Sequence, residues 1–386
     1  MTQFEVAIVG AGPAGSTAAI LLARRGYSVA LLDKEEFPRE KLCGDFLNPS
    51  CRPLFAELGI TDQLSLAQHE PVTGLRVTCA SGAETELPLI GWDGAPVSGL
   101  GLRRLFFDQI LMNQARAAGV STLLGCRVNS LSRAARGWRI AFSRNGTVAK
   151  LQARILLGAD GRNSWVANQL LPRDESTRRG RAVGFQLRLK YRGGLSGRVE
   201  IHQFLGGYAG LIGLGDGTLN LCLSAERQQS GRPLHIDDLL EKGLPRNPFL
   251  REILSRSEPI GPVRSAYPVY FTARRPHFDG ALLIGDAARV NEPVTGEGVF
   301  FALRSAAIAA ATVDHAFSYG DVSERRLSAY SSRCDREFCR RRLLNSLIRF
   351  LIYRPNLLAP LLRVSGRNKS LLSPLVQAIC TPATFV

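Results

Sequence analysis

The chain opens with short apolar runs separated by a glycine-rich turn. Residues 5–9 (EVAIV) and residues 28–33 (SVALLD) have the length and apolar content of buried strands, and residues 18–22 predict a helix between them. A strand, a turn, a helix and a second strand in this order predict the start of an α/β sheet. A loop at residues 34–48 follows the second strand.

The next third of the chain continues this mixed pattern. Residues 101–119 predict a helix, and residues 120–128 predict a strand after it. Further strands are expected from alternating apolar and polar positions, the first two as a hairpin or edge pair, at residues 72–78, 84–89, 138–143 and 148–157.

Between residues 182 and 225 the pattern becomes almost entirely strand-like, and residues 263–271 add one further candidate strand. We expect an antiparallel sheet here, inserted into the α/β domain and suited to form the wall of a substrate cavity. Its apolar positions supply candidate wall residues, which could equally be core: Phe185, Leu187, Leu189, Phe204, Leu211, Ile212 and Leu221. The chain then returns to the first domain at residues 281–286, and residues 296–317 and most of 324–353 predict helices.

The glycine-rich turn after the first strand has the spacing GAGPAG, from Gly10 to Gly15. Gly10 and Gly12 allow a tight turn in which backbone N–H groups approach a pyrophosphate, with Pro13 and Ala14 opening the helix. Asp33 ends the second strand, where a carboxylate can accept a ribose hydroxyl. The unit therefore predicts a dinucleotide site with an unphosphorylated ribose, as in FAD or NAD.

Two later motifs repeat the combination of glycine and acid: GADGRNS at residues 158–164, and GDAA…PVTGEG within residues 285–298. Three such motifs across the chain indicate that the polypeptide enters one nucleotide site three times, which is typical of a flavin-binding protein. We predict a Rossmann-like FAD-binding domain with an inserted antiparallel β-sheet substrate domain and a C-terminal helical region. The predicted boundaries are residues 1–70, 100–180 and 275–320 for the first, 71–99 and 181–274 for the second, and 321–386 for the third.

The cysteine and histidine content limits which further kinds of site the chain is expected to hold. The chain has 386 residues, eight scattered cysteines and five isolated histidines, and no cysteine pair has zinc-finger or thioredoxin spacing. We therefore expect no metal site, and most cysteines as buried thiols in a reducing, cytoplasmic environment. No basic and apolar leader precedes the first strand, so no secretory signal is expected.

The formal net charge is +16, and half of it comes from residues 340–386, which hold eight Lys or Arg and no Asp or Glu. Helical spacing groups one apolar set (Leu343, Leu344, Leu347, Ile348, Leu351 and Ile352) opposite a polar set (Arg342, Asn345, Ser346, Arg349 and Tyr353). Such a basic amphipathic helix could lie on the inner face of a membrane. It could instead cover the substrate domain. No aromatic-interleaved basic motif supports nucleic-acid binding.

The motifs resemble those of flavoproteins built like p-hydroxybenzoate hydroxylase, and within them the branch of the geranylgeranyl reductases. GLRRLFFD matches the family's Arg four residues before an Asp, which points to Arg104. The resemblance implies that Asp160 and Gly161 contact the cofactor and that Asp286 holds its ribityl chain. It also implies that the turn from Pro293 through Gly296 and Glu297 to Gly298 presents N–H groups to the isoalloxazine ring.

The segment FPREKLCGDFLNP resembles the Lys-x-Cys-Gly loop of the reductase branch. There the cysteine lies near the flavin, which points to Cys43, between Lys41 and Gly44. Arg39, Lys41 and nearby dipoles could lower the Cys43 pKa and populate its thiolate. The alternative is a small residue that packs on the cofactor. Lys34, Val128 and Gly285 complete the predicted cofactor-binding set.

Two features of the substrate sheet depart from the known branches. The Tyr-x-Trp-x-Phe-Pro motif of the reductases keeps only its tyrosine, Tyr208, and the Trp-x-Trp-x-Ile-Pro motif of the sister halogenases is missing. Halogenation is therefore not expected. A second glycine unit for permanent NAD(P)H binding is also missing, because GGYAG at residues 206–210 leads into strand-like sequence. We expect NAD(P)H to act as a transient reductant.

Three functions stay open on a hydrophobic aromatic, polyketide-like or isoprenoid substrate. The first, which we favour because the tyrosine motif is broken, is NAD(P)H-dependent monooxygenation through a flavin hydroperoxide. The second is reduction of a carbon–carbon double bond, with Cys43, Tyr208 or Tyr267 as candidate proton donors. The third is a flavin carrier without catalysis.

Overall fold

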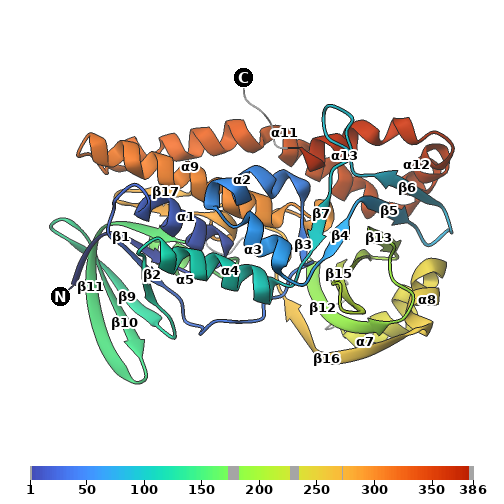
Figure 1. Ribbon diagram of the computed structural model, residues 1–386, viewed down its shortest axis with the longest axis horizontal. Helices are drawn as coiled ribbons and strands as arrows, with labels where there is room; N and C mark the ends of the chain where they lie inside the picture. The colour runs from blue at the N-terminus through green and yellow to red at the C-terminus, as the bar shows by residue number, and fades with distance from the viewer. Residues whose placement is uncertain (1, 173–181, 227–233, 272, 382–386) are drawn as a thin grey trace.

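Five parallel strands form the centre of the first sheet in the computed structural model, which describes residues 2–172, 182–226, 234–271 and 273–381 (Figure 1). Their order is β18-β11-β1-β2-β8. The bounds are β1 (Thr2–Val9), β2 (Val29–Leu32), β8 (Ser121–Leu123), β11 (Thr147–Gly158) and β18 (Ala281–Leu283). Because β1 and β2 lie inside the sheet and are covered on both faces, they need the continuous apolar runs seen in the sequence.

Helices α1 (Pro13–Ala23), α4 (Arg104–Ala117) and α9 (Gly298–Ser318) cover one face of this sheet. Val6 and Ile8 of β1 point into that layer, while Ala7 and Val9 point to the opposite face. That opposite core also contains residues of the hairpin arm formed by β9 (Arg127–Ala134) and β10 (Gly137–Arg144). The alternation along β1 therefore divides the domain into two packed layers.

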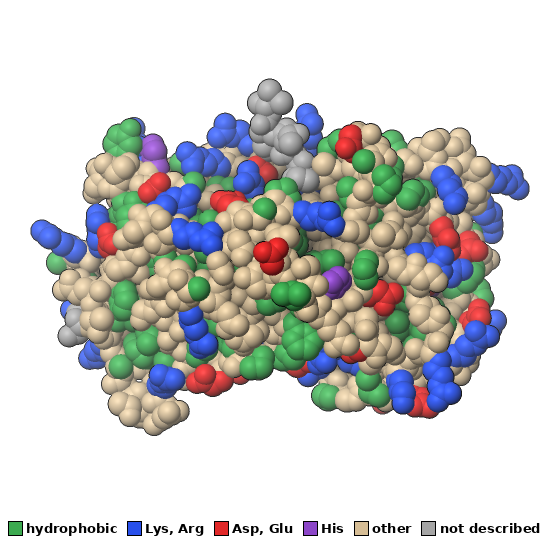
Figure 2. Space-filling view, viewed as in Figure 1, with side chains coloured by type: hydrophobic (Ala, Val, Ile, Leu, Met, Phe, Trp, Pro, Cys, Tyr) green, Lys and Arg blue, Asp and Glu red, His purple; other side chains and the backbone are tan. Residues whose placement is uncertain are grey.

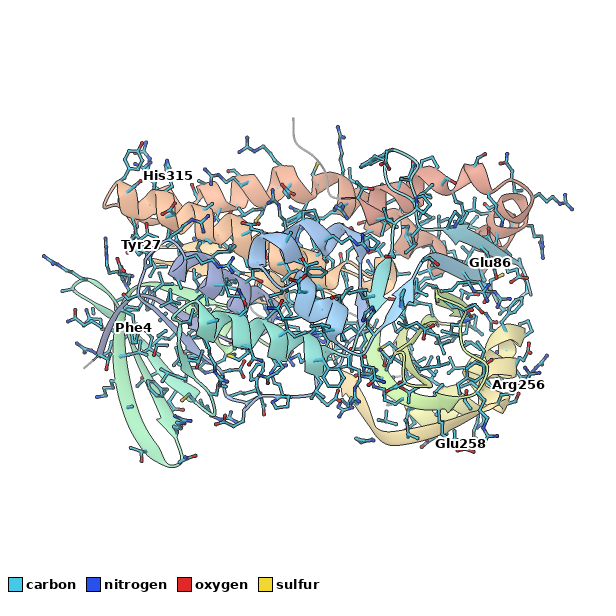
Figure 3. The ribbon with its side chains drawn as sticks, viewed as in Figure 1. Phe4, Tyr27, Glu86, Arg256, Glu258 and His315 are labelled. Carbon is cyan, nitrogen blue, oxygen red and sulfur yellow. The ribbon has the colours of Figure 1, made fainter. Side chains whose placement is uncertain are left out.

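A long-range contact joins the segment between α1 and β2 to helix α9. Tyr27 of that segment, labelled in Figure 3, donates a hydrogen bond from its hydroxyl to Asp314 of α9, with 2.7 Å between the oxygens. Helix α9 is long and apolar enough to cross a membrane, but 78% of its apolar window is buried inside the protein. It is therefore packed as a core helix.

The second sheet has seven strands in the order β16-β12-β15-β14-β13-β5-β6 and is antiparallel except where β13 meets β5. The bounds are β5 (Gly74–Thr78), β6 (Glu84–Pro88), β12 (Ala182–Tyr191), β13 (Arg198–Phe204), β14 (Gly207–Gly213), β15 (Thr218–Glu226) and β16 (Ser257–Ala266). This is the inserted antiparallel sheet that the sequence predicts, and the predicted hairpin of β5 and β6 is part of it. The predicted fold class is confirmed.

Smaller elements connect the two sheets. A three-stranded sheet lies between them, made of β3 (Phe46–Leu47), β4 (Glu70–Val72) and β7 (Gly99–Gly101). The other helices outside the C-terminal region are α2 (Arg52–Leu58), α3 (Thr61–Leu66), α5 (Trp165–Leu170), a helical turn α7 (Ile236–Asp238) and α8 (Pro248–Ser255). Strand β17 (His277–Phe278) pairs antiparallel with β18 at the end of the first sheet. Helix α8 packs on the second sheet, opposite its cavity face.

Two sequence-based strand boundaries are wrong for local backbone reasons. The predicted strand at residues 120–128 splits into β8 and β9, because Gly125 adopts a left-handed conformation with φ of 64°. The predicted strand at residues 263–271 is instead β16, which ends at Ala266. Pro268 follows and has no N–H group to donate to a ladder.

The C-terminal region is helical, with α10 (Glu324–Leu327), α11 (Ala329–Ile352), α12 (Pro355–Arg367) and α13 (Ser373–Cys380). The predicted division of α11 into one apolar and one polar face is wrong. In the predicted apolar set Ile352 is buried while Leu343 and Leu347 are exposed, and Asn345 of the predicted polar set is buried. Asn345 turns inward because its amide donates to the carbonyl of Glu292, at 2.8 Å, and to Thr295, so the helix braces the third glycine motif.

Arg341, one turn before Asn345 on the same buried face, forms an ion pair with the buried carboxylate of Glu297. Replacing Arg341 with Met should lower the free energy of unfolding by about 3–5 kcal/mol, because it leaves a buried carboxylate without its partner. Chemical denaturation measures this loss. The control is the adjacent, exposed Arg340→Met, which should change stability by less than about 0.5 kcal/mol; equal effects of the two variants would contradict the bracing role.

Candidate active site

The three glycine motifs meet because the carboxyl ends of their strands are aligned. Val9 is in register with Gly158, and Gly158 is in register with Leu283. The backbone hydrogen bonds continue past the strand ends, since Ala159 donates to Val9 and Ile284 donates to Gly158 at 2.7 and 2.9 Å. Ligands of open parallel sheets bind at such an edge.

Glycine is required where the first and second motifs touch. A Cβ on Gly10 would lie 2.4 Å from the carbonyl oxygen of Ala159, and Gly10 has φ of 104°. A Cβ on Gly15 would lie 1.8 Å from the carbonyl oxygen of Gly10. These two positions therefore hold the turn and the start of α1 against the sheet.

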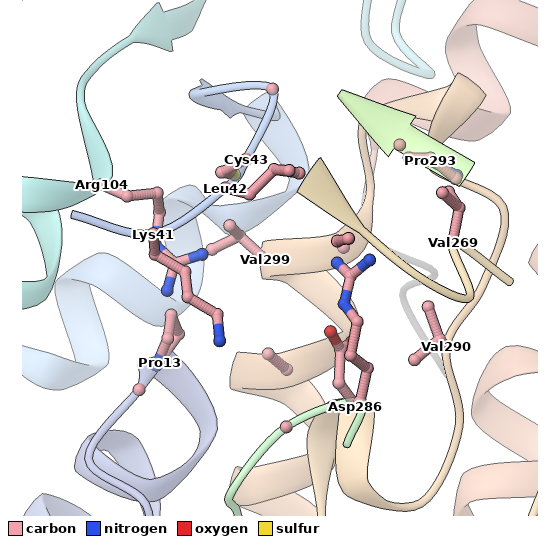
Figure 4. A pocket seen from close by; sticks show the side chains of 18 of the residues that line it. Pro13, Lys41, Leu42, Cys43, Arg104, Val269, Asp286, Val290, Pro293 and Val299 are labelled. Atoms are coloured by element: carbon pink, nitrogen blue, oxygen red, sulfur yellow. The ribbon is translucent and has the colours of Figure 1, made fainter. Parts of the chain in front are cut away.

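A cavity of about 1420 Å³ opens above this edge and continues to the second sheet (Figure 4). Helices α1 and α9 both begin at its wall, and neither has a side chain that caps its first N–H groups. A Cβ on Gly298 would meet nothing within 4 Å, and one on Gly12 only the tip of Arg39, at 3.7 Å. Uncapped helix ends with open space in front of them suit the phosphate and ring atoms of FAD.

Asp33 lies on the wall of the cavity beside the start of α1. One carboxylate oxygen accepts from the backbone of Ala11 at 2.7 Å, and the other accepts from that of Glu35 at 2.9 Å. Each oxygen retains a lone pair. The carboxylate is thus fixed in place as an acceptor, as the predicted ribose contact requires.

Basic side chains line the cavity between this acid and the second sheet. Arg104 is buried and makes two parallel hydrogen bonds to Asp108, of 2.7 and 2.8 Å. Arg39 lies 3.1 Å from the same carboxylate. Burial and the positive charges of Arg104, Arg39 and Arg162 lower the pKa of Lys41. This concentration of cations favours an anionic group such as a pyrophosphate.

The two acids of the later motifs differ in what holds them. Asp160 accepts hydrogen bonds from the hydroxyl of Ser164 and the backbone of Val166, so its side chain organises the start of α5. Burial raises the pKa of Asp160. Asp286 lies across the cavity from Lys41 and partly opposes the lowering of that lysine's pKa (Figure 4).

Most predicted cofactor residues lie on one continuous wall. It includes Gly10, Gly12, Pro13, Ala14, Asp33, Lys34, Arg39, Lys41, Cys43, Gly44, Arg104, Val128, Asp160, Gly161, Asp286, Pro293, Gly296 and Gly298. Gly15, Gly285 and Glu297 lie behind that wall. Glu297 faces Arg341 instead of the cavity, because its buried carboxylate needs a cation. Any contact of its backbone with the cofactor stays a prediction.

The Cys43 loop is clamped to the second sheet. The carbonyl oxygen of Cys43 accepts hydrogen bonds from Gln186 (2.9 Å), Asn220 (2.8 Å) and the thiol of Cys222 (3.0 Å). Asp45, two residues on, accepts from the backbone of Arg104 and forms an ion pair with Arg188. Donors from both domains therefore fix where the Cys43 side chain lies.

The thiolate expected from the sequence at Cys43 needs correction. Burial raises the pKa of the Cys43 thiol above its ordinary value, although the guanidinium of Arg104 partly offsets this effect. Arg39 and Lys41, which the sequence placed in this role, are not among the groups that lower it. Cys43 is therefore a neutral thiol at neutral pH, with a cation beside its sulfur.

Tyr208 lies on the cavity wall, and its hydroxyl proton is used in a hydrogen bond within the protein. Its hydroxyl donates to Glu292 at 2.7 Å, and Glu292 also lies 3.3 Å from Arg349 of α11. Burial and the charge of Glu292 raise the pKa of Tyr208. Tyr353, which the sequence assigned to the polar face of α11, packs edge-on against the Tyr208 ring and bonds to Ser224.

The part of the cavity away from the glycine motifs is apolar. Ile212 lines it as predicted, together with Tyr267 and with Ile379 of α13. The other six predicted wall residues pack in the core under α8, although two of them, Phe185 and Leu211, also reach the cavity wall: Phe185, Leu187, Leu189, Phe204, Leu211 and Leu221. Strand alternation alone does not tell the two apolar faces of a covered sheet apart.

Sequence analysis missed Glu292, Asn220 and Gln186. Glu292 directly precedes Pro293 of the third motif, so its position was a usable signal. Asn220 and Gln186 are polar residues in apolar strands, and both are fully buried. Buried amides need partners, so their burial indicates the Cys43 loop once the sheet is known.

The fold and the cavity together define a flavoprotein that binds FAD. The chain belongs to the FAD binding domain family, which matches residues 3–340. Within it, the chain is a member of the p-hydroxybenzoate hydroxylase and geranylgeranyl reductase superfamily, as its motifs predict.

The chain is 30% identical over 371 residues to the menaquinone reductase of Mycobacterium tuberculosis, covering 91% of this chain and 85% of that one. It is 28% identical over 345 residues to digeranylgeranylglycerophospholipid reductase 2 of Methanopyrus kandleri, covering 87% and 83%. A geranylgeranyl bacteriochlorophyll reductase-like protein of Thermoplasma acidophilum has a similar fold, with a TM-score of 0.79, 20% identity and coverage of 98% and 96%.

Gly12→Val places two methyl groups in the space before α1. The backbone of Gly12 has φ of −72°, which any residue adopts, so the apoprotein should fold normally. Its affinity for FAD should fall at least about tenfold, or roughly 1.4 kcal/mol. Fluorescence titration of the apoprotein with FAD measures the affinity, and circular dichroism checks the fold. Unchanged affinity would place the cofactor elsewhere.

Proposed function

We propose that this protein reduces a carbon–carbon double bond in an isoprenoid lipid, with an isoprenoid quinone as the first candidate substrate. We call the cavity wall formed by the three glycine motifs the FAD cradle. The observation that carries the proposal is the neutral Cys43 thiol, held between this cradle and the apolar part of the cavity. The names of the two relatives, which refer to menaquinone and to digeranylgeranylglycerophospholipid, support an isoprenoid substrate.

The size and lining of the cavity suit such a molecule. Its volume of about 1420 Å³ exceeds the range of roughly 300–1,000 Å³ typical of small-molecule sites, so a second molecule fits beside a cofactor. Leu75, Val199, Ile201 and Ile212 line the far part, and none of them can hydrogen-bond through its side chain. An isoprenoid chain is stabilised there by apolar burial.

Reduced FAD, when bound, supplies the hydride equivalent that the reduction of a double bond requires. The second carbon needs a proton, and the Cys43 thiol holds one at its sulfur. Arg104 favours the thiolate left after the proton moves, because its cation lies beside the sulfur. The thiolate then regains a proton from solvent, so the substrate gains two hydrogen atoms in total.

Cys43 suits this role better than the two tyrosines predicted with it. The only hydroxyl proton of Tyr208 is directed to Glu292, away from a substrate. Tyr267 lies on the cavity wall, partly exposed, so it stays a candidate. We assign Tyr208 a positioning role: it links the cavity to Glu292 and thereby to α11.

NAD(P)H is the proposed reductant, docking only during flavin reduction. Residues 206–210 form part of the β13–β14 hairpin, so this glycine-rich segment does not begin a helix that could bind a second dinucleotide.

Monooxygenation of a hydrophobic substrate is the second candidate. It is favoured by the sequence of β14, in which Tyr208 is followed by Ala209 and Gly210 without the tryptophan of the reductase motif. The same cradle and apolar cavity would serve that reaction, with exclusion of water as the main contribution of the protein.

Anaerobic turnover separates the two reactions. Purified protein with FAD, NAD(P)H and an isoprenoid quinone should give a product with two added hydrogen atoms, identified by mass spectrometry, whether or not oxygen is present. A product formed only in air and carrying one added oxygen atom would replace the reductase with the monooxygenase.

Cys43→Ala should lower kcat of the reduction by about 10²–10⁴, the usual contribution of a positioned proton donor. Its FAD content and KM should stay close to those of the unmodified protein, because the clamp on the loop uses the backbone carbonyl of Cys43. The control is Cys222→Ala, which removes one of three donors to that carbonyl and should cost much less. Equal losses of kcat in the two variants would indicate that Cys43 has a structural role.

The raised pKa of Cys43 predicts how the rate of its alkylation depends on pH. A group whose pKa is raised keeps its proton until the pH exceeds its ordinary value of 9.0. The rate of Cys43 alkylation by iodoacetamide, followed by peptide mass spectrometry, should therefore stay low between pH 7 and pH 9 and rise only above it. Exposed Cys339 provides the reference in the same sample. A rise centred near pH 7 would contradict a neutral thiol.

A further inference from the structure

We propose that the outer face of the C-terminal helices docks on a bilayer containing anionic lipids. The docking surface is defined by six exposed apolar side chains: Leu343, Leu347, Phe350, Leu357, Val364 and Leu371. They account for six of the thirteen large apolar side chains exposed in the described part of the chain, within a segment of under thirty residues. Apolar exposure gathered in this way marks an interaction surface.

Helical spacing places these side chains on coherent faces. Leu343, Leu347 and Phe350 follow each other at intervals of four and three residues on α11 and are 71%, 50% and 46% exposed. Leu357 and Val364 are seven residues apart on α12, two turns along one face. Each helix therefore presents an apolar stripe outward.

The charge of the segment fits anionic headgroups. Residues 340–386 contain eight basic residues and no acid. Three of the eight form ion pairs with acids outside the segment, and five are exposed: Arg340, Arg354, Arg363, Arg367 and Lys369. Arg354 also stacks on Phe350, with its guanidinium carbon 3.8 Å from the ring centroid. A basic side chain beside an apolar ring is suited to the boundary between headgroups and acyl chains.

Figure 2 shows Lys and Arg side chains projecting along the edge of the molecule where these helices run in Figure 1. Each basic side chain near an anionic membrane surface adds to the attraction between protein and membrane, and salt weakens that attraction. An anionic membrane is thus favoured over a neutral one.

The C-terminal helices that carry the docking surface lie close to the cavity. Leu358 and Leu362 of α12 share a core with Tyr208, and Val376, Ile379 and Cys380 of α13, which contacts α11, line the cavity. A docked bilayer would therefore lie near the substrate cavity. This proximity deepens the proposed function, and the docking depends on that function only for the identity of the lipid.

Vesicle flotation of the full-length protein tests the docking. The protein should float with vesicles of phosphatidylcholine and phosphatidylglycerol, and not with phosphatidylcholine alone. Leu343→Ser with Leu347→Ser, and separately Arg363→Glu with Arg367→Glu, should each lower the bound fraction about tenfold or more. High salt should release the protein as well.

The matched controls are exposed residues of the same types elsewhere: Leu66→Ser with Leu205→Ser, and Arg246→Glu with Arg251→Glu. They should float like the unmodified protein. Absence of flotation, or equal losses in the controls, overturns the docking. Turnover of a short-chain, water-soluble quinone without vesicles reports on the reaction alone, so failure of the docking and failure of the proposed reaction are distinguishable.

Discussion

The parallel pairing of β1 with β11 is the constraint on which the rest of the structure depends. It brings Gly10 so close to Ala159 that no Cβ fits between them, and it joins two motifs that begin 148 residues apart, at Gly10 and Gly158. The pairing of β11 with β18 then adds the third motif at the same edge. The helix ends at this edge are left without side-chain caps, so the sheet creates an anion site by its geometry alone.

A second set of contacts ties this cradle to the substrate sheet. The carbonyl of Cys43 accepts from three side chains of the sheet, while Asp45 bonds to Arg104 on one side and Arg188 on the other. These groups are buried, and a buried polar group without a partner is costly. The two domains therefore hold one relative position at the loop, and the thiol of Cys43 stays between cofactor and substrate.

Much of this arrangement could be predicted from the sequence, because its signals are local. Gly10, Gly12 and Asp33 follow the strand–turn–helix–strand order, and most cofactor residues lie on the cavity wall. The neutral state of Cys43 could not be predicted, since it results from burial by distant segments. Nor could the inward orientation of Asn345, whose partners lie fifty residues away on the third motif. Helical periodicity shows which positions of a helix are polar, but it does not show whether a polar side chain has a buried hydrogen-bond partner elsewhere in the chain.

The central claim is that three distant motifs form one binding site for FAD. Equilibrium dialysis of the purified apoprotein against FAD, with both concentrations measured, tests it most directly. The account predicts saturation at one FAD for each chain. A protein that retains no FAD, or that binds it without a defined stoichiometry, would contradict the assignment of the cradle and every chemical step that depends on it.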